Sequence, residues 1–225
     1  MMKTVVVVPV YNEGDRVIKV VGEILKVDSD IKVVVVDDGS IDNSYELLKK
    51  NFSKIKRVWL LKHEINLGKG SAMKTGVRVA KKLKSETVIF VDGDGQHNPK
   101  YIPQFVEVLK DKEIVFGYRQ LNGEMPFVRK WGNIFAKKLL ALLFKIKRKE
   151  FLCGFMGFRM NVFGKIKWKS NRYGVETEIA TKVAKNNLSY SEIIIDTIYV
   201  DKYKGVSLID AVKVLLKIPI WYFSK

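Results

Sequence analysis

The sequence feature that most constrains the fold is an apolar run that ends in two carboxylates. Val88–Val91 leads directly into Asp92-Gly93-Asp94-Gly95-Gln96-His97. A short run of apolar, largely β-branched residues is typical of a strand buried on both faces of a sheet. Asp92 and Asp94 are two residues apart, so in extended backbone their side chains point the same way. Two such carboxylates suit Mg²⁺ or Mn²⁺, and Gln96 and His97 are further candidate ligands. The simpler interpretation is an Asp-Gly turn between a strand and a helix.

The first half of the chain alternates between apolar runs and segments with helical spacing. We predict strands at 3–10, 31–36, 57–61, 87–91 and 114–116, and helices at 13–25, 43–50, 68–83 and 99–109. Alternation at this spacing indicates an α/β fold with a mostly parallel sheet and helices on both faces. Ligands then bind beyond the carboxyl ends of the strands, where the loops at 9–13, 37–40 and 92–96 are expected to meet.

The second half has a different composition. Residues 119–172 hold 14 Lys and Arg but only two acids, Glu124 and Glu150. Within this block, 127–144 is predicted to be a helix with lysines on one face and apolar residues on the other. That pattern is typical of a helix at a bilayer interface, although an amphipathic helix packed on its own domain fits as well. A helix at 173–185, a strand at 193–200 and an apolar helix at 206–223 complete the prediction, the last as an interfacial segment or a helix for a partner.

Overall composition narrows the class of protein. A chain of 225 residues with 47% hydrophobic residues suits one globular domain. A single cysteine, Cys153, excludes an internal disulfide and fits a reducing compartment. We see neither the pattern of a signal peptide nor an apolar stretch long enough to span a membrane. The net charge of +17 favours an anionic partner, which can be nucleic acid, an anionic membrane surface or a phosphorylated substrate.

Four motifs stand in order along the first half of the chain. They are Val8-Pro9-Val10-Tyr11-Asn12-Glu13, Val36-Asp37-Asp38-Gly39-Ser40, Asn66-Leu67-Gly68-Lys69-Gly70 and Asp92-Gly93-Asp94-Gly95-Gln96. In this order and spacing the sequence resembles glycosyltransferase family 2, the inverting enzymes of the GT-A fold. Within the family it is most similar to the dolichyl- and polyprenyl-phosphate mannose and glucose synthases. The resemblance is strong over 3–119 and continues weakly to 207.

The resemblance implies a single GT-A catalytic domain over residues 1–225. A Rossmann-like, mostly parallel central sheet with helices on both faces would be followed by C-terminal amphipathic interfacial helices. Residues 1–118 would bind the nucleotide-sugar, 119–205 would face the acceptor and the membrane, and 206–225 would form the last amphipathic helix. Two departures stand out: Glu150 occupies a position where the family often has Asp, and we see none of the membrane spans of some relatives. The chain would then be peripheral or need a membrane-anchoring partner protein.

The resemblance also implies roles for individual residues. Those expected to bind the nucleotide-sugar are Pro9, Tyr11, Glu13, Asp37, Asp38, Lys69, Asp92 and Gly93. Those expected to hold Mg²⁺ or Mn²⁺ are Asp92, Asp94 and Gln96. Those expected to bind the acceptor phosphate are Arg119, Arg129, Asn133 and Lys202. Catalytic roles are expected for Asp94, Arg119 and Glu178.

Several of these residues have a simpler alternative. Lys69 is predicted at a helix N-terminus, which attracts anions, but a solvated surface lysine fits too. Arg129 can equally be one charge among many. An acceptor phosphate is already ionised near neutral pH and needs no strong base, whereas a hydroxyl acceptor needs one. Glu176 and Glu178 are the candidates for that base, and both can instead be ordinary carboxylates on a helix surface.

The expected function is therefore inverting, metal-dependent transfer of a hexose from GDP-mannose or UDP-glucose to polyprenyl or dolichyl phosphate. The protein is expected to be cytoplasmic and peripheral on the cytoplasmic face of the membrane. A family 2 enzyme that acts on a soluble or polysaccharide hydroxyl acceptor is the alternative. A nucleic-acid-binding protein is prompted by the charge, but the basic block has no RNA-binding aromatic signature or zinc pattern, and nucleic acid is not an expected partner.

Overall fold

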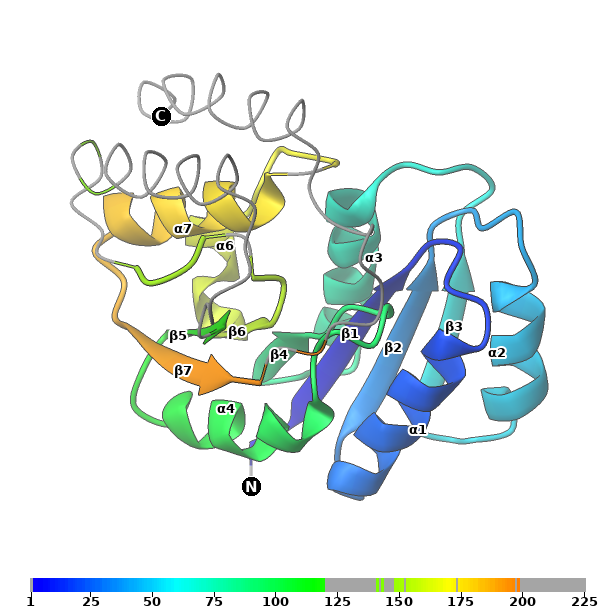
Figure 1. The fold of residues 1–225 in the computed structure, drawn as a ribbon. Helices are drawn as coiled ribbons and strands as arrows, with labels where there is room; N and C mark the ends of the chain where they lie inside the picture. The colour runs from blue at the N-terminus through cyan, green and yellow to red at the C-terminus, as the bar shows by residue number, and fades with distance from the viewer. Residues whose placement is uncertain are drawn as a thin grey trace.

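The computed structural model describes residues 2–119, 141, 143, 148–151, 153–172, 174–196 and 198. Over these residues the chain builds one seven-stranded sheet in the order β3-β2-β1-β4-β6-β5-β7 (Figure 1). The strands are β1 (Thr4–Val10), β2 (Lys32–Asp37), β3 (Val58–Lys62), β4 (Thr87–Phe90), β5 (Ile114–Arg119), β6 (Met156–Arg159) and β7 (Tyr190–Ile195). The helices are α1 (Arg16–Val27), α2 (Ser44–Phe52), α3 (Lys69–Lys82), α4 (Ile102–Val108), α6 (Phe163–Ile166) and α7 (Val175–Lys185), with 3-10 turns η1 (Pro99–Tyr101) and η2 (Met160–Val162).

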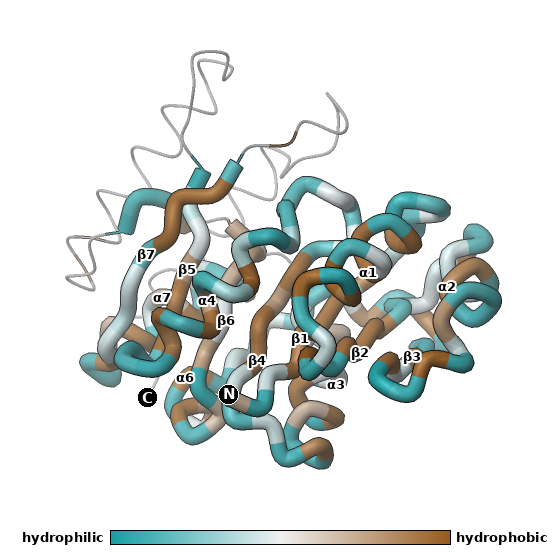
Figure 2. The backbone as a smooth tube through the Cα atoms, turned by 90° about the horizontal axis from the view of Figure 1, so that it is seen from below, coloured by the Kyte–Doolittle hydropathy of each residue, from teal (hydrophilic) through white to brown (hydrophobic). Residues whose placement is uncertain are grey.

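The sheet is covered by helices on both faces, as the strand pattern predicts. Every residue of β1 is buried, and alternate residues face opposite sides. Val5 and Val7 join a core with α3, α6 and α7, whereas Val6 and Val8 join a core with α1, α2 and α4. The strands lie in the hydrophobic centre, and the helices alternate between hydrophobic and hydrophilic residues (Figure 2). Gly76 lets α3 lie against β1, because a Cβ there would collide with Val7.

Six of the strands run in one direction. β1 pairs in parallel with β2 and β4, β2 with β3, and β5 with β7. β6 lies antiparallel between β4 and β5, so it separates two parallel halves. The predicted mostly parallel α/β sheet is confirmed, but β6 was not predicted. Its four residues include Gly157, and so short a segment gives no periodicity to detect.

Other element boundaries differ from the prediction in instructive ways. The last strand is Tyr190–Ile195 rather than 193–200, because pairing with β5 begins at Tyr190 opposite Ile114. The predicted helix at 99–109 is divided into η1 and α4. The predicted helix at 206–223 and most of the helix at 127–144 lie outside the described residues. Among the described residues, no helix is long and apolar enough to cross a membrane.

Candidate active site

The candidate site lies where β1, β2 and β4 end. Asp38, which follows β2, is buried and ties two loops together. Its carboxylate accepts hydrogen bonds from the backbone N–H groups of Leu67 (3.1 Å) and Gly68 (2.7 Å), and its Oδ1 lies 2.7 Å from Nδ1 of His63. Gly39 has φ +72°, and a Cβ there would lie only 2.7 Å from the backbone nitrogen of Asn66. The loop after β2 is therefore fixed against the loop that begins α3.

The first loop is held by hydroxyl groups from the neighbouring loop. The Ser44 hydroxyl accepts hydrogen bonds from the backbone N–H groups of Glu13 (2.9 Å) and Gly14 (2.8 Å). The Ser40 hydroxyl accepts one from Asn12 (3.0 Å), whose φ of +54° turns the chain. These bonds hold the backbone at 12–14 in a defined shape next to the end of β2.

Three expected donor-binding residues surround this edge. Pro9 is buried within β1, where it pairs with Val36, and Tyr11 beyond the strand is 41% exposed. Asp37 is fully buried, and its Oδ1 accepts a hydrogen bond from the backbone N–H of Ser40 (2.9 Å). Its other oxygen, Oδ2, has no hydrogen-bond partner among the described residues. A buried acceptor without a donor is unusual in a native protein, and a ligand N–H or O–H group would satisfy it.

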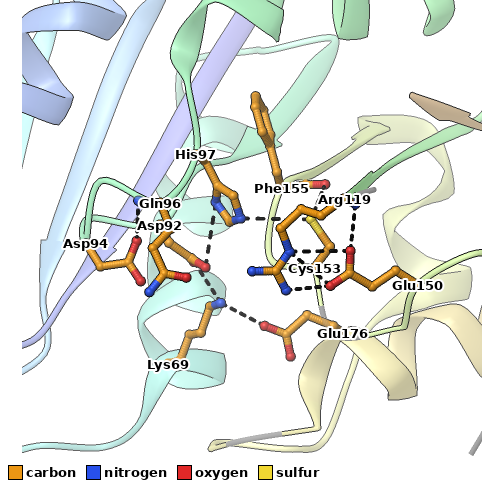
Figure 3. A network of polar contacts seen from close by, with 10 residues as sticks. All are labelled: Lys69, Asp92, Asp94, Gln96, His97, Arg119, Glu150, Cys153, Phe155 and Glu176. Atoms are coloured by element: carbon orange, nitrogen blue, oxygen red, sulfur yellow. Dashed lines mark hydrogen bonds and ion pairs between the residues drawn. The ribbon is translucent and has the colours of Figure 1, made fainter. Parts of the chain in front are cut away.

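Lys69 joins three elements. It is the first residue of α3, and its Nζ lies 2.7 Å from Oδ1 of Asp92 and 2.7 Å from Oε1 of Glu176 in α7 (Figure 3). Burial alone would lower the pKa of Lys69, but the negative charges of Asp92 and Glu176 outweigh it and raise the pKa above its ordinary value. The ammonium group is therefore charged at any physiological pH. Gly154 lies against this pair, because a Cβ there would collide with Asp92 and lie 2.6 Å from Nζ of Lys69.

The loop after β4 offers oxygen ligands. Asp92 and Asp94 are partly buried, and Asp94 Oδ1 accepts a hydrogen bond from the backbone N–H of Gln96 (2.9 Å). Gly93, the other expected donor-binding residue of this loop, is buried against Pro9 and Val10.

The oxygen donors fit a metal that is bound partly by its substrate. Among the described residues, no three His, Cys, Asp or Glu side chains are grouped to hold a metal ion. Two carboxylates and an amide oxygen nevertheless suit Mg²⁺ or Mn²⁺, which proteins often bind through one or two carboxylates together with substrate phosphates. Asp92, Asp94 and Gln96 would supply the protein's share.

His97 and Cys153 form the buried wall behind these carboxylates. Nδ1 of His97 lies 3.8 Å from Oδ2 of Asp92, and Nε2 lies 3.8 Å from the sulfur of Cys153. Burial lowers the pKa of His97, and burial raises the pKa of Cys153 to about 12. Both groups are therefore neutral at physiological pH, and Cys153 is an unreactive thiol.

Arg119 ends β5 on the other side of this wall. Its backbone N–H donates to Oε2 of Glu150 (2.8 Å), its Nε donates to Oε1 (3.1 Å), and its Nη2 donates to Oε1 as well. Burial alone would lower the pKa of Arg119, but the hydrogen bonds and charge of Glu150 outweigh it and raise the pKa. The charges of Arg119 and Asp92 also influence each other, so a cation suited to a phosphate lies near the carboxylate loop.

The two candidate bases in α7 are separated by the helix. Glu176 points to Lys69, whereas Glu178 accepts hydrogen bonds from the backbone N–H groups of Lys169 and Ser170, both at 2.8 Å. Residues two apart on a helix do not share a face. Glu178, the expected catalytic residue, is thus used to hold the 169–170 backbone, and Glu176 is the carboxylate of the network. The expected acceptor ligands Arg129, Asn133 and Lys202 lie outside the described residues.

Some residues of the site were beyond reach of the sequence. His63 gives no signal as the partner of Asp38, because only the adjacency of β2 and β3 brings the two together. The role of Glu150 had one weak signal, its replacement of an Asp in the family pattern. Its pairing with Arg119, 31 residues away, depends on the path of the chain between them.

The fold defines the class of protein. The chain superimposes on the crystal structure of glucosyl-3-phosphoglycerate synthase from Mycobacterium tuberculosis in complex with Mn²⁺, UDP and glucosyl-3-phosphoglycerate. The TM-score is 0.75 at 16% identity, over 98% of this chain and 80% of that one. A likeness at this level establishes the GT-A fold. The family model for glycosyl transferase family 2 matches residues 5–167, and the chain belongs to that family.

Two relatives with described activities have similar lengths. The UDP-N-acetylglucosamine–dolichyl-phosphate N-acetylglucosaminyltransferase of Methanococcus voltae is 30% identical over 216 residues, which is 87% of this chain and 85% of the relative. The undecaprenyl-phosphate mannosyltransferase of Micrococcus luteus is 23% identical over 195 residues, which is 82% of this chain and 79% of the relative. The predicted similarity to the polyprenyl-phosphate branch of the family is confirmed.

Proposed function

We propose that this glycosyltransferase moves a sugar from a nucleoside diphosphate to the phosphate of a polyprenyl phosphate, with inversion at the anomeric carbon. The observation that carries the proposal is the position of Arg119, a cation suited to phosphate, beside the Asp92 loop. The names of the two relatives, which act on dolichyl and undecaprenyl phosphate, support the same acceptor class. GDP-mannose and UDP-glucose are the donors expected from the sequence, and the archaeal relative adds UDP-N-acetylglucosamine.

The proposed reaction makes one bond and breaks one. An ionised acceptor oxygen attacks the anomeric carbon, the bond from that carbon to the diphosphate breaks, and the nucleoside diphosphate leaves. Arg119 holds the acceptor phosphate, and Lys69 offsets the negative charge of the diphosphate. No residue has to remove a proton, because the acceptor is already ionised. Mg²⁺ or Mn²⁺ held by Asp92, Asp94 and Gln96 would supply Lewis-acid stabilisation of the leaving group.

The acceptor is tested directly by a transfer assay. Purified protein is incubated with each of the three sugar nucleotides, a polyprenyl phosphate in detergent and Mg²⁺ or Mn²⁺, and the lipid product is measured. Arg119→Ala should raise the KM for the lipid at least tenfold and leave the KM for the sugar nucleotide within about twofold, because a tenfold change is about 1.4 kcal/mol of acceptor binding. Transfer by the wild type to hydroxyl acceptors alone would overturn the proposal in favour of the second family activity.

The metal requirement has a test of its own. EDTA should abolish transfer, and Asp94→Asn should lower the rate more than about a hundredfold, or about 3 kcal/mol of barrier. Asp111→Asn is the matched control, because Asp111 is exposed in the turn after α4. Full activity in EDTA would remove the metal from the proposal and leave the acceptor class untouched.

A further inference from the structure

The ion pairs of Lys69 hold a cation on a carboxylate that is expected to bind metal. Nζ of Lys69 lies 2.7 Å from both Asp92 and Glu176. Metal and ammonium both carry positive charge, so they cannot share the Asp92 carboxylate without strong repulsion. A metal ion that binds Asp92 must therefore weaken the contact between Lys69 and Asp92.

Glu176 offers Lys69 a second partner that the metal does not need. Its side chain is only 9% exposed, and the residue lies in the first turn of α7, a rigid element packed against the α3 side of the sheet. When the ammonium leaves Asp92, its contact with Glu176 keeps it from becoming an unpaired, partly buried charge. The side chain of Lys69 is 25% exposed, so the ammonium is also within reach of a ligand at the open edge of the sheet.

We propose that Lys69 is a displaceable counter-ion that couples metal binding to donor binding, with Glu176 as the residue that positions it. The inference rests on the proposed function for the identity of the two ligands, a divalent cation and a nucleoside diphosphate. Without the diphosphate, Lys69 occupies Asp92 and opposes the metal. The diphosphate attracts the ammonium away from Asp92, and the freed carboxylate then binds the metal. Each ligand therefore strengthens the binding of the other, by the same factor in both directions.

The two partners of the switch predict opposite effects on metal binding. Lys69→Met should tighten the binding of Mn²⁺ alone about tenfold, because Asp92 is freed and a positive charge is removed. Glu176→Gln should weaken it about threefold or more, because Lys69 then depends on Asp92 alone. The dissociation constant is measured with Mn²⁺ as the probe, by calorimetry or by the electron paramagnetic resonance of the free ion. No catalysis is involved.

The coupling is measured by repeating the titrations with UDP present. In the wild type UDP should tighten Mn²⁺ binding strongly, and in Lys69→Met the same factor should fall at least about fivefold, or about 1 kcal/mol of coupling free energy. Lys74→Met is the matched control, because Lys74 is also on α3 but donates to the amide oxygen of Asn171 (2.8 Å). It should leave both quantities within about twofold of the wild type.

The outcomes separate this inference from the proposed function. Unchanged or weaker Mn²⁺ binding in Lys69→Met, or tighter binding in Glu176→Gln, overturns the switch even if the enzyme glycosylates polyprenyl phosphate. Opposite shifts of the expected sign, with reduced coupling in Lys69→Met, support the switch even if the acceptor is a hydroxyl group. Circular dichroism of each variant shows that the changes are measured on folded protein.

Discussion

Arg148 shows that a buried side chain can be held without its hydrogen-bonding capacity being used. Its side chain is 0% exposed, and its guanidinium carbon lies 3.6 Å from the centre of the Phe116 ring. Nε lies 3.4 Å from Glu192, but Nη1 and Nη2 have no hydrogen-bond partner among the described residues. Burial lowers the pKa of Arg148 accordingly. Such a charge contributes little to stability, since its removal from water is poorly offset.

Arg57 is the opposite case, and the pair makes a residue-scale prediction. The Arg57 guanidinium donates to the backbone carbonyls of Leu25, Asp28 and Ile31. Arg57→Met should lower the free energy of unfolding by about 2 kcal/mol, because three carbonyls lose a charged donor. Arg148→Met should not lower it, because methionine fits between aromatic rings and no hydrogen bond is lost. Urea unfolding followed by circular dichroism measures both. An equal loss in the two variants would contradict this account of Arg148.

At the same scale, sequence patterns predicted the position of Lys69 and Asp92 better than their contacts. Asp92 follows a buried strand and Lys69 begins a helix, and both facts are local. Their meeting with Glu176 depends on α3 and α7 lying on the same face of the sheet, and Glu176 is more than a hundred residues beyond Lys69. Local periodicity fixes which element a residue is on, but not which distant element lies next to it.

At the element scale, Glu178 fastens the segment before α7 to the N-terminal end of α3. It holds the backbone at Lys169 and Ser170, while the indole N–H of Trp168 donates to the carbonyl of Gly70 (2.9 Å). Gly70 is required there, because a Cβ would collide with the carbonyl of Ser170. Burial raises the pKa of Glu178, but the hydrogen bonds from Ser170 and Lys169 outweigh it, and the pKa is lowered.

This segment gives a prediction with a defined pH dependence. Glu178→Gln should cost about 2 kcal/mol of folding free energy at pH 7, because two hydrogen bonds to a charged acceptor are weakened. The folded pKa is below the unfolded value, so the contribution is full above the unfolded pKa of about 4.3 and is lost as pH falls through the folded pKa. The difference between wild type and variant should therefore shrink below about pH 4. Urea unfolding at pH 7 and in acid measures it, and a difference that grows in acid would contradict the assignment.

Two glycines test how closely the element before β6 must approach the site. Gly154→Ala would force Asp92 and Lys69 apart, so it should lower transfer at least tenfold, about 1.4 kcal/mol of barrier. Gly164→Ala, in α6, meets nothing within 4 Å and should raise stability by about 0.5–1 kcal/mol with transfer unchanged. Transfer assays and thermal unfolding of the two variants measure the contrast. Equal activity in both would show that the ion pair tolerates displacement.

The elements also show where sequence patterns reach their limit. The β-branched runs of β1, β2 and β4 predicted the parallel half of the sheet, because strands buried on both faces have a continuous apolar pattern. β6 has four residues, and its place between β4 and β5 is decided by pairing across the sheet. It reverses direction there, so the sequence order of strands gives no indication of it.

At the scale of the whole molecule, the charge of +17 predicts how the protein associates with its surroundings. The chain should sediment with vesicles that contain anionic phospholipid and should not bind vesicles of neutral phospholipid. Each lysine or arginine at an anionic surface contributes about 1 kcal/mol, and this attraction falls off within a Debye length. Raising salt from about 0.05 M to about 0.5 M shortens that length severalfold and should release the protein.

Duplex DNA at physiological salt is the control for charge alone in this whole-molecule prediction. Weak binding to DNA beside firm binding to anionic vesicles would place the acceptor at a membrane surface, as polyprenyl phosphate requires. Vesicle binding that survives high salt would contradict an electrostatic attachment and point to apolar insertion. Equal binding to DNA and vesicles would mean that the charge is unselective. The location of the enzyme at the cytoplasmic face of a membrane would then need an anchoring partner protein to explain it.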